Sequence, residues 1–214
     1  HLTYDQVHKY FLRTRPLRWP PGTNQSYSNH GFGLWTLLVE KISGKSYVNV
    51  ANEYLQGMGL KGPVRPMSPQ RDALDAWPHE FAGGSYRTIE LKSAGLGLAA
   101  GGWTASAKSL LQIMRHLKRD HSDREIDDMG WSGDAKGKLE HSGATGGGSS
   151  YVVMFPNGYI SNNGSNLSNV HVALAANIKA DGADLETLAN KIALAVPGAN
   201  VGTDYDIWKF KPAN

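Results

Sequence analysis

Two short stretches of this chain carry side chains that could move a proton or hold an anion. The first, residues 21–31, reads as a turn, a short rigid segment and the start of a helix, and it places Tyr27 and Asn29 just before that helix. A helix N-terminus offers unpaired N–H groups and partial positive charge, which favour a tyrosinate or another anion nearby. A tyrosine beside a helix cap can also be a packing residue, so both interpretations stay open from this stretch alone.

The second stretch, residues 140–151, places His141 on a predicted strand that leads into a glycine-rich turn at residues 146–148. The histidine supplies a side chain that is cationic or forms hydrogen bonds. Because glycine has no side chain, a substrate can approach the neighbouring backbone N–H groups closely. A histidine near a turn can equally be structural.

Apolar periodicity and capping residues predict the elements that position these stretches. The residues between 32 and 42 are apolar on almost all sides, which is typical of a buried helix, and Gly44 is its predicted C-cap. Residues 57–102 hold many Gly and Pro, so we expect a long, mostly irregular segment. A hairpin signal lies at residues 156–158. The other helices are predicted at residues 4–13, from the cap Ser46 to Gly57, at 106–117 and at 184–196, with Leu185, Leu188, Ile192 and Val196 facing inward; strands are predicted at 138–144, 150–155 and 170–178.

Helices come first and an antiparallel sheet covered by a last helix follows, so the predicted fold class is α+β. We expect a single domain over residues 1–214, with a helical lobe at about residues 3–137 and the sheet with its C-terminal helix at about residues 138–198.

Composition excludes several classes of function. The chain has 214 residues and a formal net charge of +3, and its densest basic run, Arg115 to Arg124, is interrupted by Asp120 and Asp123, which argues against nucleic-acid binding. Zero cysteines exclude disulfides, thiolate catalysis and cysteine metal sites. The eight histidines form neither a His-x-x-x-His pair nor an HExxH motif, so no metal or other cofactor is expected. No apolar run reaches the roughly 18 residues of a membrane span.

Taken together, four motifs in order resemble the serine β-lactamase and penicillin-binding-protein superfamily, in particular its esterase, D-aminopeptidase and class C β-lactamase-like branch. The resemblance runs from about residue 2 to residue 196 and corresponds to the C-terminal two-thirds or so of that fold. It rests on Tyr27-Ser28-Asn29, on the helix end Glu40-Lys41-Ile42-Ser43-Gly44-Lys45-Ser46-Tyr47, on Ala100-Gly101-Gly102-Trp103-Thr104 before a helix, and on His141-Ser142-Gly143.

The resemblance implies that Tyr27 is the general base or proton relay of acyl transfer and that Asn29 hydrogen-bonds the substrate amide or a catalytic lysine. A phenol with an ordinary pKa of about 10 must be tuned by cations or donors to serve near neutral pH. His141 takes the place that lysine occupies in many relatives, tuning Tyr27 and holding a carboxylate or ester group. Since a neutral histidine supplies less positive charge than lysine, we expect esterase or peptidase activity rather than efficient β-lactam hydrolysis.

The same resemblance implies a substrate-binding strand at Ser142 and Gly143, an oxyanion-hole donor at the backbone N–H of Ala144, and an acyl pocket bordered by Trp103. Losing one such donor typically costs about a hundredfold in rate. Trp103 is one of six tryptophans, so it can also be an ordinary core residue.

The nucleophile of this superfamily, a serine in a Ser-x-x-Lys motif, is absent from the 214 residues. We therefore expect the chain to be a part of the fold that lacks the N-terminal strands and helix, inactive by itself, and to need a companion N-terminal fragment or a swapped dimer to cover an open sheet edge. The alternative is a catalytically silent binding module that retains the cleft. The expected substrate is a small ester, peptide or β-lactam, and relatives of this type are often exported, which favours the periplasm or the outside of the cell.

Overall fold

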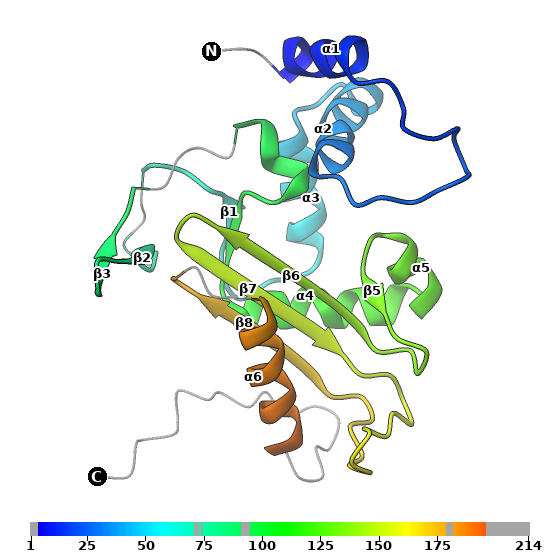
Figure 1. Ribbon diagram of the computed structural model, residues 1–214, viewed down its shortest axis with the longest axis vertical. Coiled ribbons are helices and arrows are strands. Elements are labelled where there is room, and N and C mark those ends of the chain that lie inside the picture. The colour runs from blue at the N-terminus through cyan, green and yellow to red at the C-terminus, as the bar shows by residue number, and fades with distance from the viewer. Residues whose placement is uncertain (1–3, 71–72, 74, 91–94, 179–181, 196–214) are drawn as a thin grey trace.

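The computed structural model describes residues 4–70, 73, 75–90, 95–178 and 182–195 (Figure 1). Its helices and short strands come first and an antiparallel sheet with a last helix follows, which confirms the α+β class. The elements in chain order are α1 (Tyr4–Thr14), α2 (Asn29–Ser43), α3 (Tyr47–Gly57), β1 (Val64–Pro66), β2 (His79–Ala82), β3 (Ser85–Thr88), the 3-10 helix η1 (Gly95–Ala100), β4 (Trp103–Ala105), α4 (Ala107–Asp120), α5 (Asp123–Asp128), β5 (Ser132–Gly133), β6 (Leu139–Thr145), β7 (Gly148–Met154), β8 (His171–Ala176) and α6 (Gly182–Ala195).

The main sheet is antiparallel and has the strand order β5-β6-β7-β8. Helices α4 and α6 pack on its two faces, and Figure 1 shows α6 in front of the sheet and α4 behind it. Because side chains alternate along a strand, β7 contributes buried side chains to both faces of the sheet. One buried cluster, on the α6 face, contains Tyr151, Val153, Phe155, Leu167, Val170, Val172, Leu185, Ala189 and Ala193. The other, against α4 and α5, contains Met114, Ile126, Leu139 and Met154.

Serine caps start the helices that the sequence predicts. The side chains of Ser28, Ser46 and Ser106 each accept a hydrogen bond from the backbone N–H three residues later, at the starts of α2, α3 and α4. Such a bond satisfies one of the N–H groups that a helix start leaves without a partner. Gly44 ends α2 in the left-handed conformation, with φ of 68°, as predicted.

Helix α2 is not the buried helix that its composition predicts. Only Gly33 and Thr36 are buried, while Trp35 is 58% exposed and Ile42 is 84% exposed. The described elements cover the helix on the sides of η1 and α3 and leave this apolar stripe open to solvent. The prediction of burial was therefore wrong for the described chain.

The segment between residues 57 and 102 contains more strand than the sequence suggests. Strand β1 pairs with β4, and β2 pairs with β3 as a separate antiparallel hairpin. Each of these strands has only three or four residues, which is too short to show a clear alternation.

Residues 156–158 form the predicted turn, in which the Tyr159 N–H donates to the Pro156 carbonyl at 3.2 Å, but the antiparallel strands β7 and β8 are joined by a longer loop that inserts Leu167 and Val170 into the core. One detail of the sheet half was predicted wrongly. On α6, Leu188 is 46% exposed, whereas Ala189 and Ala193 are completely buried. The small alanine side chains allow this helix to approach the sheet, so the leucine lies outside the contact. Val196, the other inward residue predicted there, lies outside the described residues.

Candidate active site

The start of α2 fixes the relative positions of Tyr27 and Asn29. Ser28 adopts an extended conformation and accepts a hydrogen bond of 3.0 Å from the backbone N–H of Gly31. The Tyr27 hydroxyl donates a hydrogen bond of 2.9 Å to Oδ1 of Asn29. Tyr27 is 66% exposed, so its hydroxyl can be reached from solvent.

The ring of Tyr27 connects to the sheet half through Phe32. The two ring centroids lie 5.6 Å apart. Phe32 in turn reaches Gly130: a Cβ atom built on Gly130 would lie only 2.9 Å from Cζ of Phe32. Helix α2 thus contacts the segment between α5 and β5.

Helix α1 also lies against this end of α2. Nδ1 of His8 is 3.2 Å from Nε2 of His30, the residue that follows Asn29, and the Phe11 ring lies 4.5 Å from the His30 ring between centroids. The described contact of α1 with the candidate site therefore runs through an imidazole pair and one aromatic ring.

His141 lies in β6, half-buried, with its ring centroid 6.3 Å from that of Trp131 in an edge-to-face arrangement. Strand β5 pairs with β6 only at Leu139 and Glu140, and no described strand pairs with the same edge of β6 after Glu140. The residues from Ser142 to Thr145 are exposed. An extended substrate could therefore add to this edge through backbone hydrogen bonds.

The turn after this strand is held in place by close packing. A Cβ atom on Gly147 would lie 2.5 Å from Cβ of Pro78 and 2.7 Å from Cδ1 of Ile89, so only glycine fits without displacing them. At Gly143 an added Cβ would lie 3.3 Å from Oγ of Ser150. The glycines after His141 thus serve packing as well as access to the backbone of Ala144.

Opposite His141, the other face of β6 carries a polar network. The Tyr151 hydroxyl donates to Oε2 of Glu140, and Nζ of Lys138 lies 2.7 Å from the same oxygen and 3.6 Å from Oε1 of Glu186 on α6. Burial, followed by the hydrogen bond to the Glu140 carboxylate, raises the pKa of Tyr151 far above its ordinary value. Tyr151 is therefore a neutral hydrogen-bond donor that ties β7 to β6.

The structure connects the predicted residues only in part. Tyr27 and Asn29 are hydrogen-bonded to each other, and contacts lead from Tyr27 through Phe32 to Gly130, and from the adjacent Trp131 to His141. Within the described residues, no hydrogen bond joins Tyr27 to His141 directly. The catalytic roles of these residues stay predictions.

Trp103 has a packing environment of its own. Its indole N–H donates a hydrogen bond of 2.8 Å to the carbonyl of Leu98, and its ring stands edge-on to Tyr47 at 6.4 Å between centroids. These contacts hold η1 and α3 beside β4. The predicted place of Trp103 at an acyl pocket remains a prediction.

Sequence reasoning missed Trp131, Phe32 as a connector, and the network around Glu140. A period of two along residues 138–141 would have put Lys138 and Glu140 on the face opposite His141. No comparable signal pairs Phe32 with Gly130, since that contact joins distant parts of the chain.

Two further properties of the described residues bear on function. No group of three or more His, Asp or Glu side chains there could hold a metal ion. None of the described helices is both long and apolar enough to cross a membrane.

This arrangement of helices around an antiparallel sheet is the fold of the serine β-lactamase and penicillin-binding-protein-like superfamily. The sequence pattern of the Beta-lactamase family matches residues 4–196, and the chain belongs to that family. The recognition from short motifs is thereby confirmed.

One similar solved structure is the crystal structure of FmtA from Staphylococcus aureus, with a TM-score of 0.66 and 14% sequence identity. The match covers 91% of the present chain and 57% of the FmtA chain, so the present chain spans little more than half of the FmtA length. At this identity the likeness shows the fold alone. No curated protein matches the chain in sequence.

Proposed function

We propose that this chain is part of a serine hydrolase that transfers an acyl group from an ester, amide or β-lactam through an acyl-enzyme, with the nucleophilic serine supplied by a segment outside the 214 residues. Membership of the Beta-lactamase family supports the reaction class. The observation that carries the proposal is the exposed Tyr27 hydroxyl, held by Asn29 at the start of α2 and connected through aromatic contacts to the strand of His141.

In the proposed reaction the serine hydroxyl attacks the carbonyl carbon while Tyr27 relays the proton, its oxygen accepting the serine proton as its own hydroxyl proton moves on toward the leaving group. The bond to the leaving group breaks, the proton passes to that group, and the acyl chain stays on the serine until water releases it as a carboxylic acid. Asn29 orients the Tyr27 hydroxyl, and the backbone N–H of Ala144 stabilises the developing oxyanion. Ser142 and Gly143 bind the substrate along the open edge of β6.

His141 favours an ester or peptide substrate over a β-lactam, which is the activity expected of the esterase and D-aminopeptidase branch. An imidazole provides a weaker electrostatic partner than the ammonium of a lysine for both Tyr27 and a substrate carboxylate. A comparison of p-nitrophenyl acetate with a chromogenic cephalosporin tests this preference. We expect ester hydrolysis to exceed cephalosporin hydrolysis, and the opposite order would contradict the role given to His141.

A companion segment fits the surfaces that the described chain leaves open. Trp35, Leu38 and Ile42 form one exposed apolar stripe on α2, with Leu38 47% exposed. At the other side of the molecule, β8 is the last strand of the four-stranded sheet, and among the described residues only a bridge between His79 and Ile178, just past the end of β8, adds to it. We propose that the serine-bearing segment, from the same protein or from a swapped second copy, covers these surfaces within a single domain.

Covalent labelling of the full-length protein encoded by the gene tests the enzyme proposal. With a fluorophosphonate probe, we expect an adduct on a serine outside these 214 residues. Replacing Tyr27 by Phe should lower the labelling rate about a hundredfold or more. The matched control is Tyr54→Phe on α3, whose side chain is 58% exposed and which should label normally.

The alternative is a silent binding module, which the absence of any Ser-x-x-Lys motif in the chain favours. It predicts no adduct on any serine and no difference between Tyr27→Phe and Tyr54→Phe. If an adduct forms at the same rate in Tyr27→Phe, the protein is a serine hydrolase in which Tyr27 has no catalytic role.

A further inference from the structure

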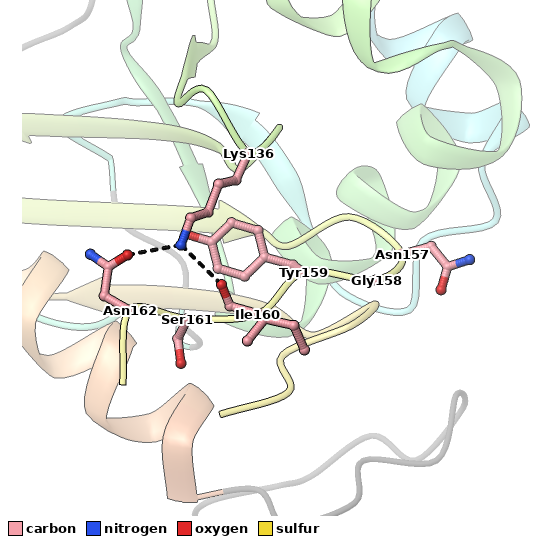
Figure 2. Close-up of a pocket in the computed structure, with 7 residues that line it drawn as sticks. All are labelled: Lys136, Asn157, Gly158, Tyr159, Ile160, Ser161 and Asn162. Atoms are coloured by element: carbon pink, nitrogen blue, oxygen red, sulfur yellow. Dashed lines mark hydrogen bonds between the residues drawn. The ribbon is translucent and has the colours of Figure 1, made fainter. Parts of the chain in front are cut away.

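A separate cavity lies at the end of the sheet away from the Gly146-Gly147 turn. It has a volume of about 450 Å³ and is formed by the loop between β7 and β8 together with one lysine from the segment before β6 (Figure 2). This volume falls within the roughly 300–1,000 Å³ of small-molecule sites. Its lining residues are Lys136, Asn157, Gly158, Tyr159, Ile160, Ser161 and Asn162.

The loop that forms the cavity is organised by its own polar side chains. Oγ of Ser161 donates to Asn163 and accepts a hydrogen bond of 2.9 Å from the backbone N–H of Ser165. Oγ of Ser168 donates to Oδ1 of Asn157 at 2.9 Å and accepts from the backbone N–H of Gly158 at 2.8 Å. A ligand would therefore meet a surface that is already formed, at little ordering cost.

Donor groups dominate the mouth of this cavity. Nζ of Lys136 donates to the Ile160 carbonyl at 3.1 Å and to Oδ1 of Asn162 at 2.8 Å, and an ammonium group has a third hydrogen to offer. Figure 2 shows the ammonium between these two partners. Nδ2 of Asn162 has no hydrogen-bond partner among the described residues. No carboxylate lines the cavity, so the ligand must be rich in acceptors rather than cationic.

The cavity also offers apolar surface next to these donors. Tyr159 is half-buried, with its hydroxyl donating to Oδ2 of Asp134 at 3.0 Å and its ring 4.9 Å from that of Phe155 between centroids. These contacts fix the ring. Ile160 is 47% exposed beside it. A ligand that carries both hydroxyl groups and C–H surface matches these donors and the apolar surface beside them, whereas a bare oxyanion would contact the donors alone.

We propose that this cavity is a saccharide-binding site, distinct from the candidate acyl-transfer site on β6. Lys136 and Asn162 hydrogen-bond the sugar hydroxyl or acetamido oxygens, and Ile160 contacts the C–H face of the sugar. Tyr159, whose ring centroid lies 5.7 Å from the Lys136 ammonium and 4.9 Å from the Phe155 ring centroid, holds Lys136 in place. The site anchors a sugar chain to the protein independently of the reaction.

Titration of the ¹⁵N-labelled chain with tri-N-acetylglucosamine, maltotriose and, separately, inorganic phosphate tests the proposal. We expect one of the two saccharides to shift backbone resonances of residues 157–162 with a dissociation constant of about 1 mM or tighter. Lys136→Gln and Asn162→Ala should each weaken this binding roughly fivefold or more, about 1 kcal/mol. The matched controls Lys108→Gln and Asn49→Ala, at exposed positions on α4 and α3, should bind as the parent chain does.

Three outcomes overturn the site. Neither saccharide shifts these resonances at about 10 mM, which is weaker than useful recognition; phosphate alone shifts them, which makes the cavity an oxyanion site; or the two cavity variants bind as well as the controls. Unchanged resonances of the buried core in each variant show that the fold is intact, so a loss of binding is then a property of the cavity.

Discussion

The sheet half and the N-terminal helices of this chain bury their apolar residues to very different extents. In the sheet half, Val153 on β7, Ile126 on α5, and Ala189 and Ala193 on α6 are completely buried. On α3 no residue is buried, and α2 buries only Gly33 and Thr36. The sheet half therefore contains two complete cores, whereas the helices have apolar side chains without a described cover.

The polar contacts of the two regions differ in the same way. The sheet half joins α6 to β6 through Lys138, which is only 14% exposed in its side chain. One ion pair of the N-terminal helices, Lys45 with Glu53, is more than half exposed at both residues and is worth roughly 0–1 kcal/mol at most. The sheet half is therefore stabilised by buried contacts of its own, whereas the described contacts of the N-terminal helices are mostly caps and exposed pairs.

The largest expected effect separates the two regions directly. Phe155→Ala in the sheet core should lower the free energy of unfolding by about 3–5 kcal/mol, because Phe155 is 2% exposed and its removal leaves a cavity. Trp35→Ala on α2 removes a larger side chain that is 58% exposed, and it should change the unfolding free energy of the isolated chain by no more than about 0.5 kcal/mol.

Urea unfolding followed by circular dichroism measures both values. In the protein with its companion segment, Trp35→Ala should become clearly destabilising if that segment covers α2. A Trp35→Ala effect as large as that of Phe155→Ala in the isolated chain would instead show that α2 is covered within these 214 residues.

A second prediction concerns His171, a half-buried histidine on strand β8 of the sheet half. Burial, followed by the nearby positive charges of Lys118 and Arg115, lowers the pKa of His171 from 6.5 to about 4. Its Nδ1 is buried and has no hydrogen-bond partner among the described residues. In the unfolded chain the imidazole takes up a proton near pH 6.5, whereas in the folded chain it stays neutral down to about pH 4.

Because the unfolded state binds the extra proton in this window, stability falls as the pH drops from about 6.5 to about 4 and is unaffected by this group above it. The shift corresponds to a loss of roughly 3 kcal/mol. Comparing unfolding free energies at pH 7 and pH 4 measures it. His171→Leu should remove most of this acid sensitivity. The control is His121→Gln, which replaces a half-buried histidine at the end of α4 and should leave the acid sensitivity in place. Equal acid sensitivity in His171→Leu and the parent chain would disprove the assignment.

The sequence was sufficient for the sheet half because its signals are local and agree with one another. The β-rich residues of β7, the alternating apolar residues of β8 and the glycine turn between β6 and β7 each predict an element that the structure contains. Burial of α2 could not be predicted in the same way. An apolar helix surface indicates that something must cover it, and the residues that do so need not be in the chain at hand.

The candidate site shows the same limit. The spacing of Tyr27 and Asn29 around a helix cap indicated that they lie close together, and a local hydrogen bond joins them, whereas their catalytic roles stay predictions. The contact of Phe32 with Gly130 could not be read from the sequence, because it depends on how α2 docks on the segment before β5. Family motifs supplied the expected roles, which the packing does not reveal by itself.

The docking of the two regions through Phe32 can be broken at Gly130. This glycine has φ of +99°, and a Cβ there would lie 2.9 Å from Cζ of Phe32. Gly130→Ala should therefore cost about 1–3 kcal/mol from the backbone strain and the clash together. In the background Phe32→Leu, whose shorter side chain makes room, the added cost of Gly130→Ala should be smaller. Thermal unfolding of the four proteins of this double-mutant cycle gives the coupling, and strict additivity would show that the two residues do not meet.

The smallest expected effect concerns the cap that positions the candidate base. Ser28→Ala removes the side chain that accepts from the Gly31 N–H, and it should cost about 1 kcal/mol of stability. Ser28→Asp retains an acceptor at the helix start and should keep most of that stability. The matched substitution in the other region, Ser122→Ala at α5, also removes a cap and should cost a similar amount.

The labelling rate separates the two caps. In the full-length protein encoded by the gene, only Ser28→Ala should also slow fluorophosphonate labelling, because only that cap holds Tyr27 and Asn29 in register. Equal labelling rates for Ser28→Ala and Ser122→Ala would show that the start of α2 stabilises the helix without positioning a catalytic group.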